Sequence, residues 1–139
     1  PFLPFSGEWT MAEIIYKEET YRVIGACFEV YNDKGHGFVE PVYQACVEIE
    51  LHHLGIPFSS QTELDLYYRG ERLPLTYIPD LICFDKIIVE LKAVKQIDDA
   101  HRAQVWNYLR ATGFELGLLV NFGHHPGLQW ERIVLTQQA

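Results

Sequence analysis

The chain has 139 residues and a formal net charge of −8, with 48% apolar and 22% charged residues. This balance is typical of a folded globular protein and excludes an intrinsically disordered chain. The length suffices for one hydrophobic core without disulfides or a structural metal, and no apolar run approaches the length of a membrane-spanning helix. The acidic charge argues against an extended basic surface for nonspecific nucleic-acid binding, but it leaves room for a local basic patch or a metal-screened site.

The three cysteines, Cys27, Cys46 and Cys83, lie far apart and form no CxxC pair. An odd number of dispersed cysteines indicates small buried hydrophobes in a reducing compartment, so we expect a cytoplasmic protein without a zinc or iron–sulfur site. Residues 1–13 have neither the charged start nor the long apolar core of a signal peptide. We expect them to be an N-terminal extension, ordered or disordered, and residues 14–139 to form a single domain.

Two amphipathic helices are predicted in the first half of the chain. Apolar residues recur at helical spacing between residues 18 and 31, and Gly35 follows as a stop signal. The pattern repeats between residues 38 and 54. Pro41 is compatible only with the first turn of that second helix, because proline has no N–H to donate. The first turn of the helix must therefore include Glu40 or immediately precede it.

The chain then becomes rich in predicted strands. One hairpin is expected to turn at residues 69–71, where Arg-Gly-Glu separates two partly alternating runs. A second hairpin should join residues 75–84 to residues 87–94 through Asp85 and Lys86. Its strands carry apolar residues at both odd and even positions, which point to opposite faces, so helices should cover both faces of the sheet.

A third helix is expected over residues 98–112, with acids at its dipole-positive start and Gly113 at its end. Two further strands follow at residues 115–122 and 130–135. The order of elements predicts an α/β (α+β) fold, in which a mixed central β-sheet is flanked by helices.

Apart from Asp85 and Lys86 at the expected turn, three charged residues interrupt the apolar stretch of residues 78–94, which reads IPDLICFDKIIVELKAV. Glu90 and Lys92 are two apart on one strand, so their side chains leave the same face. A two-residue loop would place Asp80 opposite Leu91 and on the other face, whereas a three-residue connection or a bulge would place it opposite Glu90. A shared site for the three charges therefore requires a connection with an odd number of residues, or a bulge.

Two facing carboxylates at a sheet edge predict a site for Mg²⁺ or Mn²⁺, since these hard cations take oxygen ligands and keep several waters. A lysine beside them can orient and help deprotonate a metal-bound water, or stabilise the charge of a phosphoryl transition state. The alternative is that Asp80, Glu90 and Lys92 form ordinary ion pairs at frayed strand ends.

These residues also carry a family resemblance. Pro79-Asp80 followed by Glu90-Leu91-Lys92 resembles the PD-(D/E)XK motif of restriction-endonuclease-like nucleases. Residues 37–43, GFVEPVY, resemble the GxxExxY signature of a family within that superfamily, and residues 104–108, QVWNY, resemble the QxxxY element of RecB-like exonucleases. The elements occur in the expected order over residues 14–135, which implies a restriction-endonuclease-like core.

The resemblance implies a metal-dependent nuclease that hydrolyses phosphodiester bonds in nucleic acid, with DNA ahead of RNA. It assigns the ligands of Mg²⁺ or Mn²⁺ to Glu40, Asp80, Glu90 and the backbone carbonyl of Leu91. It further implies that Lys92 activates water and that Gln104 and Tyr108 orient the substrate. No iron–sulfur cluster is expected, and a homodimer and a monomer are both left open.

Each of these assignments has a structural alternative. Glu40 has the position of a dipole-complementing acid in a first helical turn, and Gln104 and Tyr108 suit a polar helix flank. A non-catalytic module that binds a protein or nucleic-acid partner is accordingly the rival hypothesis. His36, between two glycines, is a candidate to line the cleft. A small positive patch is expected near the third helix, made of Lys92, Lys95, Arg102 and Arg110.

Overall fold

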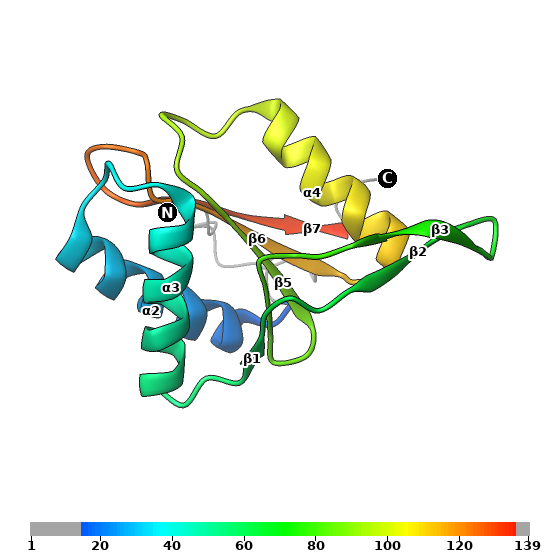
Figure 1. Ribbon diagram of the computed structural model, residues 1–139, viewed down its shortest axis with the longest axis horizontal. Coiled ribbons are helices and arrows are strands. Elements are labelled where there is room, and N and C mark those ends of the chain that lie inside the picture. The colour runs from blue at the N-terminus through cyan, green and yellow to red at the C-terminus, as the bar shows by residue number, and fades with distance from the viewer. Residues whose placement is uncertain (1–14, 136–139) are drawn as a thin grey trace, which may run out of the picture.

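The computed structural model describes residues 15–135 and shows a mixed sheet with helices on both faces (Figure 1). The helices are α2 (Lys17–Lys34), α3 (Glu40–His53) and α4 (Asp99–Thr112). The strands are β1 (Phe58–Ser59), β2 (Leu64–Tyr68), β3 (Glu71–Tyr77), β4 (Leu81–Cys83), β5 (Ile87–Lys92), β6 (Leu116–Asn121) and β7 (Gln129–Val134). The main sheet has the order β1-β4-β5-β6-β7, while β2 and β3 form a separate two-stranded sheet.

Two hydrophobic clusters lie on opposite faces of the main sheet. In β5, Val89 packs into the cluster beneath α2 and α3, whereas Ile88 packs with Val105 and Leu109 of α4. Among the strands of residues 15–135, only β5 and β6 pair in parallel, and α4 forms the crossover between them. The predicted mixed sheet with both faces covered is therefore confirmed.

The predicted strand over residues 75–84 is wrong, because the chain divides it into two elements. β3 ends at Tyr77 and pairs with β2, whereas β4 begins at Leu81 and pairs with β5. Pro79 lies in the break and is buried. Proline cannot donate a hydrogen bond to a strand ladder, so the strand is interrupted there.

The connection between β4 and β5 has the odd length that a shared charged site requires. Cys83 pairs with Ile87, so three residues, Phe84, Asp85 and Lys86, form the turn. Phe84 and Asp85 have positive φ angles of 56° and 59°, and the Lys86 N–H donates to the Cys83 carbonyl over 3.1 Å. The expectation that this turn is not a two-residue hairpin is confirmed.

Helix ends follow the predicted signals with small shifts. α4 begins after Asp98, whose side chain accepts a hydrogen bond from the His101 N–H, and it ends at the left-handed Gly113. α2 continues to Lys34, three residues beyond its predicted end, and stops at Gly35. α3 begins at Glu40 with Pro41 in its first turn, as expected.

The cysteines are free; Cys27 and Cys83 are buried and Cys46 is half-buried. Burial raises the pKa of the Cys83 thiol to about 12, which is the behaviour of an inert core residue. Within residues 15–135, none of the helices has the length and apolar character needed to cross a membrane. The extension expected at residues 1–13 lies outside the described residues.

The segment after β5 is fixed by a buried polar residue. Asn121 is fully buried, and its Oδ1 accepts hydrogen bonds from the N–H groups of Val94 (2.9 Å) and Gly123 (3.0 Å). Its Nδ2 donates to Gln129 Oε1, which also accepts from the Ile97 N–H. The backbone between Lys92 and α4 is thereby tied to β6 and β7.

We predict that Gly123→Ala destabilises the protein by about 1 to 3 kcal/mol, the usual cost of overpacking. A Cβ at this position would lie 2.4 Å from the Val94 carbonyl oxygen, and backbone atoms cannot move aside as a flexible side chain can. Urea unfolding measures the change. Gly25→Ala is the control, because a Cβ there meets nothing within 4 Å and alanine favours a helix over glycine by about 0.5 to 1 kcal/mol. If Gly123→Ala lowers the free energy of unfolding no more than Gly25→Ala does, the packing argument is contradicted.

Candidate functional site

Asp80, the residue just before β4, lies opposite Glu90 of β5. Leu81 pairs with Val89, so the next residues outward, Asp80 and Glu90, are direct neighbours. The Asp80 N–H donates to Glu90 Oε1 over 3.1 Å, and the Leu91 N–H donates to Asp80 Oδ2 over 2.7 Å. Each carboxylate is therefore held by a backbone N–H of the neighbouring segment.

Glu40 joins this pair from the first turn of α3. Its Oε2 accepts a hydrogen bond of 3.3 Å from the Ala93 N–H, just beyond the end of β5. The side chain is exposed, unlike the half-buried Asp80 and Glu90. The start of α3 thus brings the predicted third carboxylate to the same sheet end.

Tyr43, one turn after Glu40, is fully buried and belongs to the framework. Its hydroxyl donates to the Gly35 carbonyl and accepts from the Phe38 N–H, and its ring stacks on Phe122 at 4.6 Å between centroids. The residues that resemble GxxExxY therefore divide into a glutamate at the site and a tyrosine that anchors the loop before α3.

The environment of Glu90 disfavours its charge. Burial is the largest cause, and together with the nearby Asp80 it raises the pKa of Glu90 to about 7, although the Tyr77 hydrogen bond opposes the shift. A raised pKa in a pair of facing carboxylates is typical of sites where two acids compete for a proton or share a cation.

Tyr77 is the residue that the sequence did not reveal. It is 5% exposed, and its hydroxyl donates to Glu90 Oε2. Its ring stacks on Tyr108 of α4 with a centroid distance of 3.7 Å and an interplanar angle of 4°. Its position three residues before Asp80 was the available signal. The direction of its side chain could not be predicted, however, until the pairing of the hairpin strands was known.

The remaining predicted residues differ in how closely they approach the carboxylates. Lys92 is half-buried at the end of β5, two residues beyond Glu90, and forms no ion pair within residues 15–135. The Tyr108 ring is linked to the site by its stacking on Tyr77, whereas Gln104 is exposed on α4.

A hollow of about 400 Å³ opens beside the carboxylates along α3. Gln44 spans it, since its Nε2 donates to the Asp80 carbonyl (2.8 Å) and to Glu48 (3.0 Å). The lining residues are Glu40, Pro41, Gln44, Ala45, Glu48, Gln61 and Asp80. His36 is not among them; its ring stacks on His125 at 4.4 Å.

The predicted positive patch is smaller than expected. Arg102 is held by two carboxylates, Glu131 (2.7 Å) and Asp99 (2.7 Å), and Arg110 lies over the Trp106 ring at 4.7 Å. Their charges are engaged within the protein, so Lys92 and the exposed Lys95 are the cations of the patch that keep no such partner within residues 15–135.

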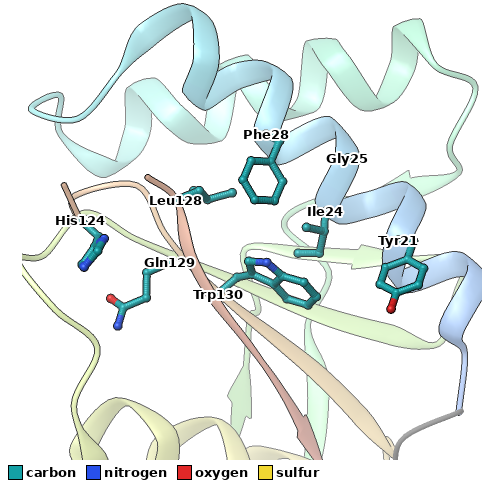
Figure 2. A pocket seen from close by; sticks show the side chains of 8 residues that line it. All are labelled: Tyr21, Ile24, Gly25, Phe28, His124, Leu128, Gln129 and Trp130. Carbon is teal, nitrogen blue, oxygen red and sulfur yellow. The ribbon is translucent and has the colours of Figure 1, made fainter. Parts of the chain in front are cut away.

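A second hollow, of about 540 Å³, lies between α2 and β7 (Figure 2). Figure 2 shows the aromatic rings of Phe28 and Trp130 beside it, with His124 and Gln129 at one end. Its lining residues are Tyr21, Ile24, Gly25, Phe28, His124, Leu128, Gln129 and Trp130. None of these is acidic, so this hollow offers no carboxylate ligand to a cation.

A hard divalent cation suits the donors at the first site. Mg²⁺ is commonly held by one or two carboxylates, with waters and substrate phosphates as further ligands, and Asp80 with Glu90 supplies such a pair. In the arrangement shown, residues 15–135 contain no group of three or more His, Cys, Asp or Glu side chains placed to hold one ion. Glu40 would therefore have to move closer to the pair to become a third ligand.

Comparisons with known proteins show the family and the fold of this chain. A family model described as the PD-(D/E)XK nuclease superfamily matches residues 17–133. The crystal structure of SSO0001 is similar with a TM-score of 0.52 at 18% identity, over 86% of this chain and 57% of that one, which shows the fold alone. The predicted restriction-endonuclease-like fold is confirmed. No curated protein matches the sequence significantly, and the GxxExxY assignment stays a prediction.

We predict that Asp80→Asn lowers the pKa of Glu90 below about 7, because the neighbouring negative charge is removed. The pKa should stay above its ordinary value of 4.5, since burial is the larger cause and remains. Carbon-13 NMR titration of the Glu90 carboxyl in chelator measures both values. An unchanged pKa would show that Asp80 and Glu90 are not close neighbours in solution.

Proposed function

Since the chain belongs to the PD-(D/E)XK nuclease superfamily, we propose that it hydrolyses phosphodiester bonds in nucleic acid, and in DNA ahead of RNA, with the help of Mg²⁺ or Mn²⁺. Members of this superfamily generally use divalent metals. The observation that carries the proposal is the register of β4 and β5, which makes Asp80 and Glu90 neighbours with Lys92 two residues further on the same face.

The proposed cation ligands are Asp80, Glu90, Glu40 and the Leu91 carbonyl oxygen. A bound cation would polarise the phosphate and the attacking water. Glu90 is held in place by the Asp80 N–H and the Tyr77 hydroxyl, so its carboxylate is presented in one orientation. Glu40, which is exposed, has the freedom to turn toward the pair.

Lys92 is proposed to hold the attacking water and assist its deprotonation. Its half-buried position beside Glu90 and the lack of an ion pair within the described residues support this role. Gln104 is exposed on α4 and is proposed to contact a substrate phosphate. The Tyr108 hydroxyl forms no hydrogen bond within residues 15–135, so it too is available to orient the substrate.

We expect the wild-type protein to bind Mn²⁺ with a dissociation constant of roughly micromolar to millimolar, as partly exposed carboxylate sites do. Glu90→Ala should abolish binding, and Glu40→Ala should weaken it less, because Glu40 is exposed and bonded elsewhere. Isothermal titration calorimetry measures these constants. Glu29→Ala is the control, since it removes an exposed acid of α2 outside the site. Absence of binding by the wild type would favour the non-catalytic module.

For hydrolysis, Lys92→Ala should lower kcat by about 100-fold or more, the usual contribution of a positioned proton-transfer group. Labelled single- and double-stranded DNA and RNA, each with Mn²⁺ or with chelator, are the substrates. Lys86→Ala is the matched control, because it removes one lysine from the opposite end of β5, where it pairs with Glu19. Cleavage that survives in Lys92→Ala would mean that another site or another protein is responsible.

A further inference from the structure

The hairpin of β2 and β3 contributes a residue to the carboxylate site although its two strands lie outside the main sheet. β3 ends at Tyr77, and the chain reaches Asp80 three residues later. Both of these residues donate hydrogen bonds to Glu90, Asp80 through its N–H to Oε1 and Tyr77 through its hydroxyl to Oε2. One short segment therefore holds both oxygens of a single carboxylate on the neighbouring strand.

Tyr77 is in turn held by α4. Its ring lies flat against the Tyr108 ring, 3.7 Å between centroids and 4° from parallel, within the cluster that contains Ile88 and Leu109. A ring that is 5% exposed and packed on one face by another ring has little freedom to rotate. The position of the hydroxyl is thus fixed by packing before any ligand is bound.

The position of α4 is fixed as well. A Cβ on Gly117 of β6 would lie 2.7 Å from Val105, so helix and sheet are in close contact. Arg102 also joins α4 to β7 through its two hydrogen bonds to Glu131. The position of Tyr108 is therefore fixed by the contacts of α4 with β6 and β7.

We infer that Tyr77 is a positioning residue for the cation ligand Glu90, and that Tyr108 acts on the same carboxylate indirectly through its stacking with Tyr77. This inference rests on the proposed function, because it concerns the cation site. It adds a residue outside the three recognised sequence motifs, and it gives the ring of Tyr108 a role separate from that of its hydroxyl. Groups that hydrogen-bond metal ligands commonly change metal affinity by about 10- to 100-fold when they are removed.

Calorimetry with Mn²⁺ on the full chain tests the role of the hydroxyl. Tyr77→Phe removes the hydroxyl and keeps the ring, so the dissociation constant should rise by about 10- to 100-fold. Tyr31→Phe is the matched control, because the Tyr31 hydroxyl donates to the His124 carbonyl away from the carboxylates. It should leave the Mn²⁺ affinity within about twofold of the wild type, although it too removes a structural hydrogen bond.

The stacking is tested at Tyr108. Tyr108→Phe keeps the ring and should preserve Mn²⁺ affinity, whereas Tyr108→Leu removes the aromatic support of Tyr77 and should weaken Mn²⁺ binding about as much as Tyr77→Phe does. Weaker binding by Tyr108→Phe, or unchanged binding by Tyr108→Leu, would overturn the indirect role of Tyr108.

A metal-free measurement shows whether the hydroxyl and the carboxylate interact at all. In chelator at pH above the Glu90 pKa of about 7, Tyr77→Phe should raise the unfolding equilibrium constant by about 10- to 100-fold. The same change in a Glu90→Gln background should have a markedly smaller effect, because the charged acceptor is gone. Equal effects in both backgrounds would overturn the inference whatever the metal does.

The outcomes separate this inference from the proposed function. If the wild type binds Mn²⁺ and cleaves nucleic acid while Tyr77→Phe binds Mn²⁺ equally well, the positioning role is wrong and the nuclease proposal stands. If the wild type neither binds Mn²⁺ nor cleaves nucleic acid, the proposed function fails. An energetic coupling between Tyr77 and Glu90 that is still measured in that case would make their contact a purely structural one. That result also overturns the positioning role.

Discussion

The facing carboxylates of Asp80 and Glu90 are the constraint on which the rest of the site depends. Two partly buried acids oppose each other's charge, and burial adds a further cost to ionisation. The protein offsets this cost with three donors, namely the Leu91 and Asp80 N–H groups and the Tyr77 hydroxyl. All three donors are fixed by β-sheet pairing or packing, so the pair can exist only while β4, β5 and the hairpin keep their relative positions.

The two faces of the sheet contribute differently to this arrangement. Helices α2 and α3 cover one face, and the first turn of α3 places Glu40 beside Ala93. On the other face, α4 and the hairpin of β2 and β3 supply Tyr108 and Tyr77. The site therefore lies where both layers reach the same end of β5, and neither layer alone provides all of its residues.

Much of the fold could be predicted from the sequence, because helical spacing, Pro41, Gly35 and Gly113 are local signals. The three helices and the shared face of Glu90 and Lys92 follow from such signals. The break at Pro79 was missed because the apolar run continued through it, although a proline argues against a central strand. The register of Asp80 could be reduced to two alternatives, but only the turn geometry decided between them.

Long-range contacts set the limit of prediction. Arg102 was assigned to a positive patch, yet its partner Glu131 lies 29 residues away and was not visible to a local pattern. Tyr77 was missed for the same reason, since it contacts a carboxylate on another strand and a ring on a helix. The motif resemblance grouped Tyr43 with Glu40, whereas its burial against Phe122 shows that it belongs to the core.

The three-residue turn between β4 and β5 has a consequence for how this domain can vary. The turn lies at the far end of β5 from Lys92 and contributes no side chain to the carboxylate pair. Because side chains alternate along a strand, a register shift of one residue would turn Asp80 toward the apolar layer beneath α2 and α3. A shift of two residues would keep its face but misalign it with Glu90. Insertions and deletions in this remote turn are therefore expected to be among the least tolerated changes in the domain, unless the turn absorbs the added residue without moving the pairing of Leu81 and Val89.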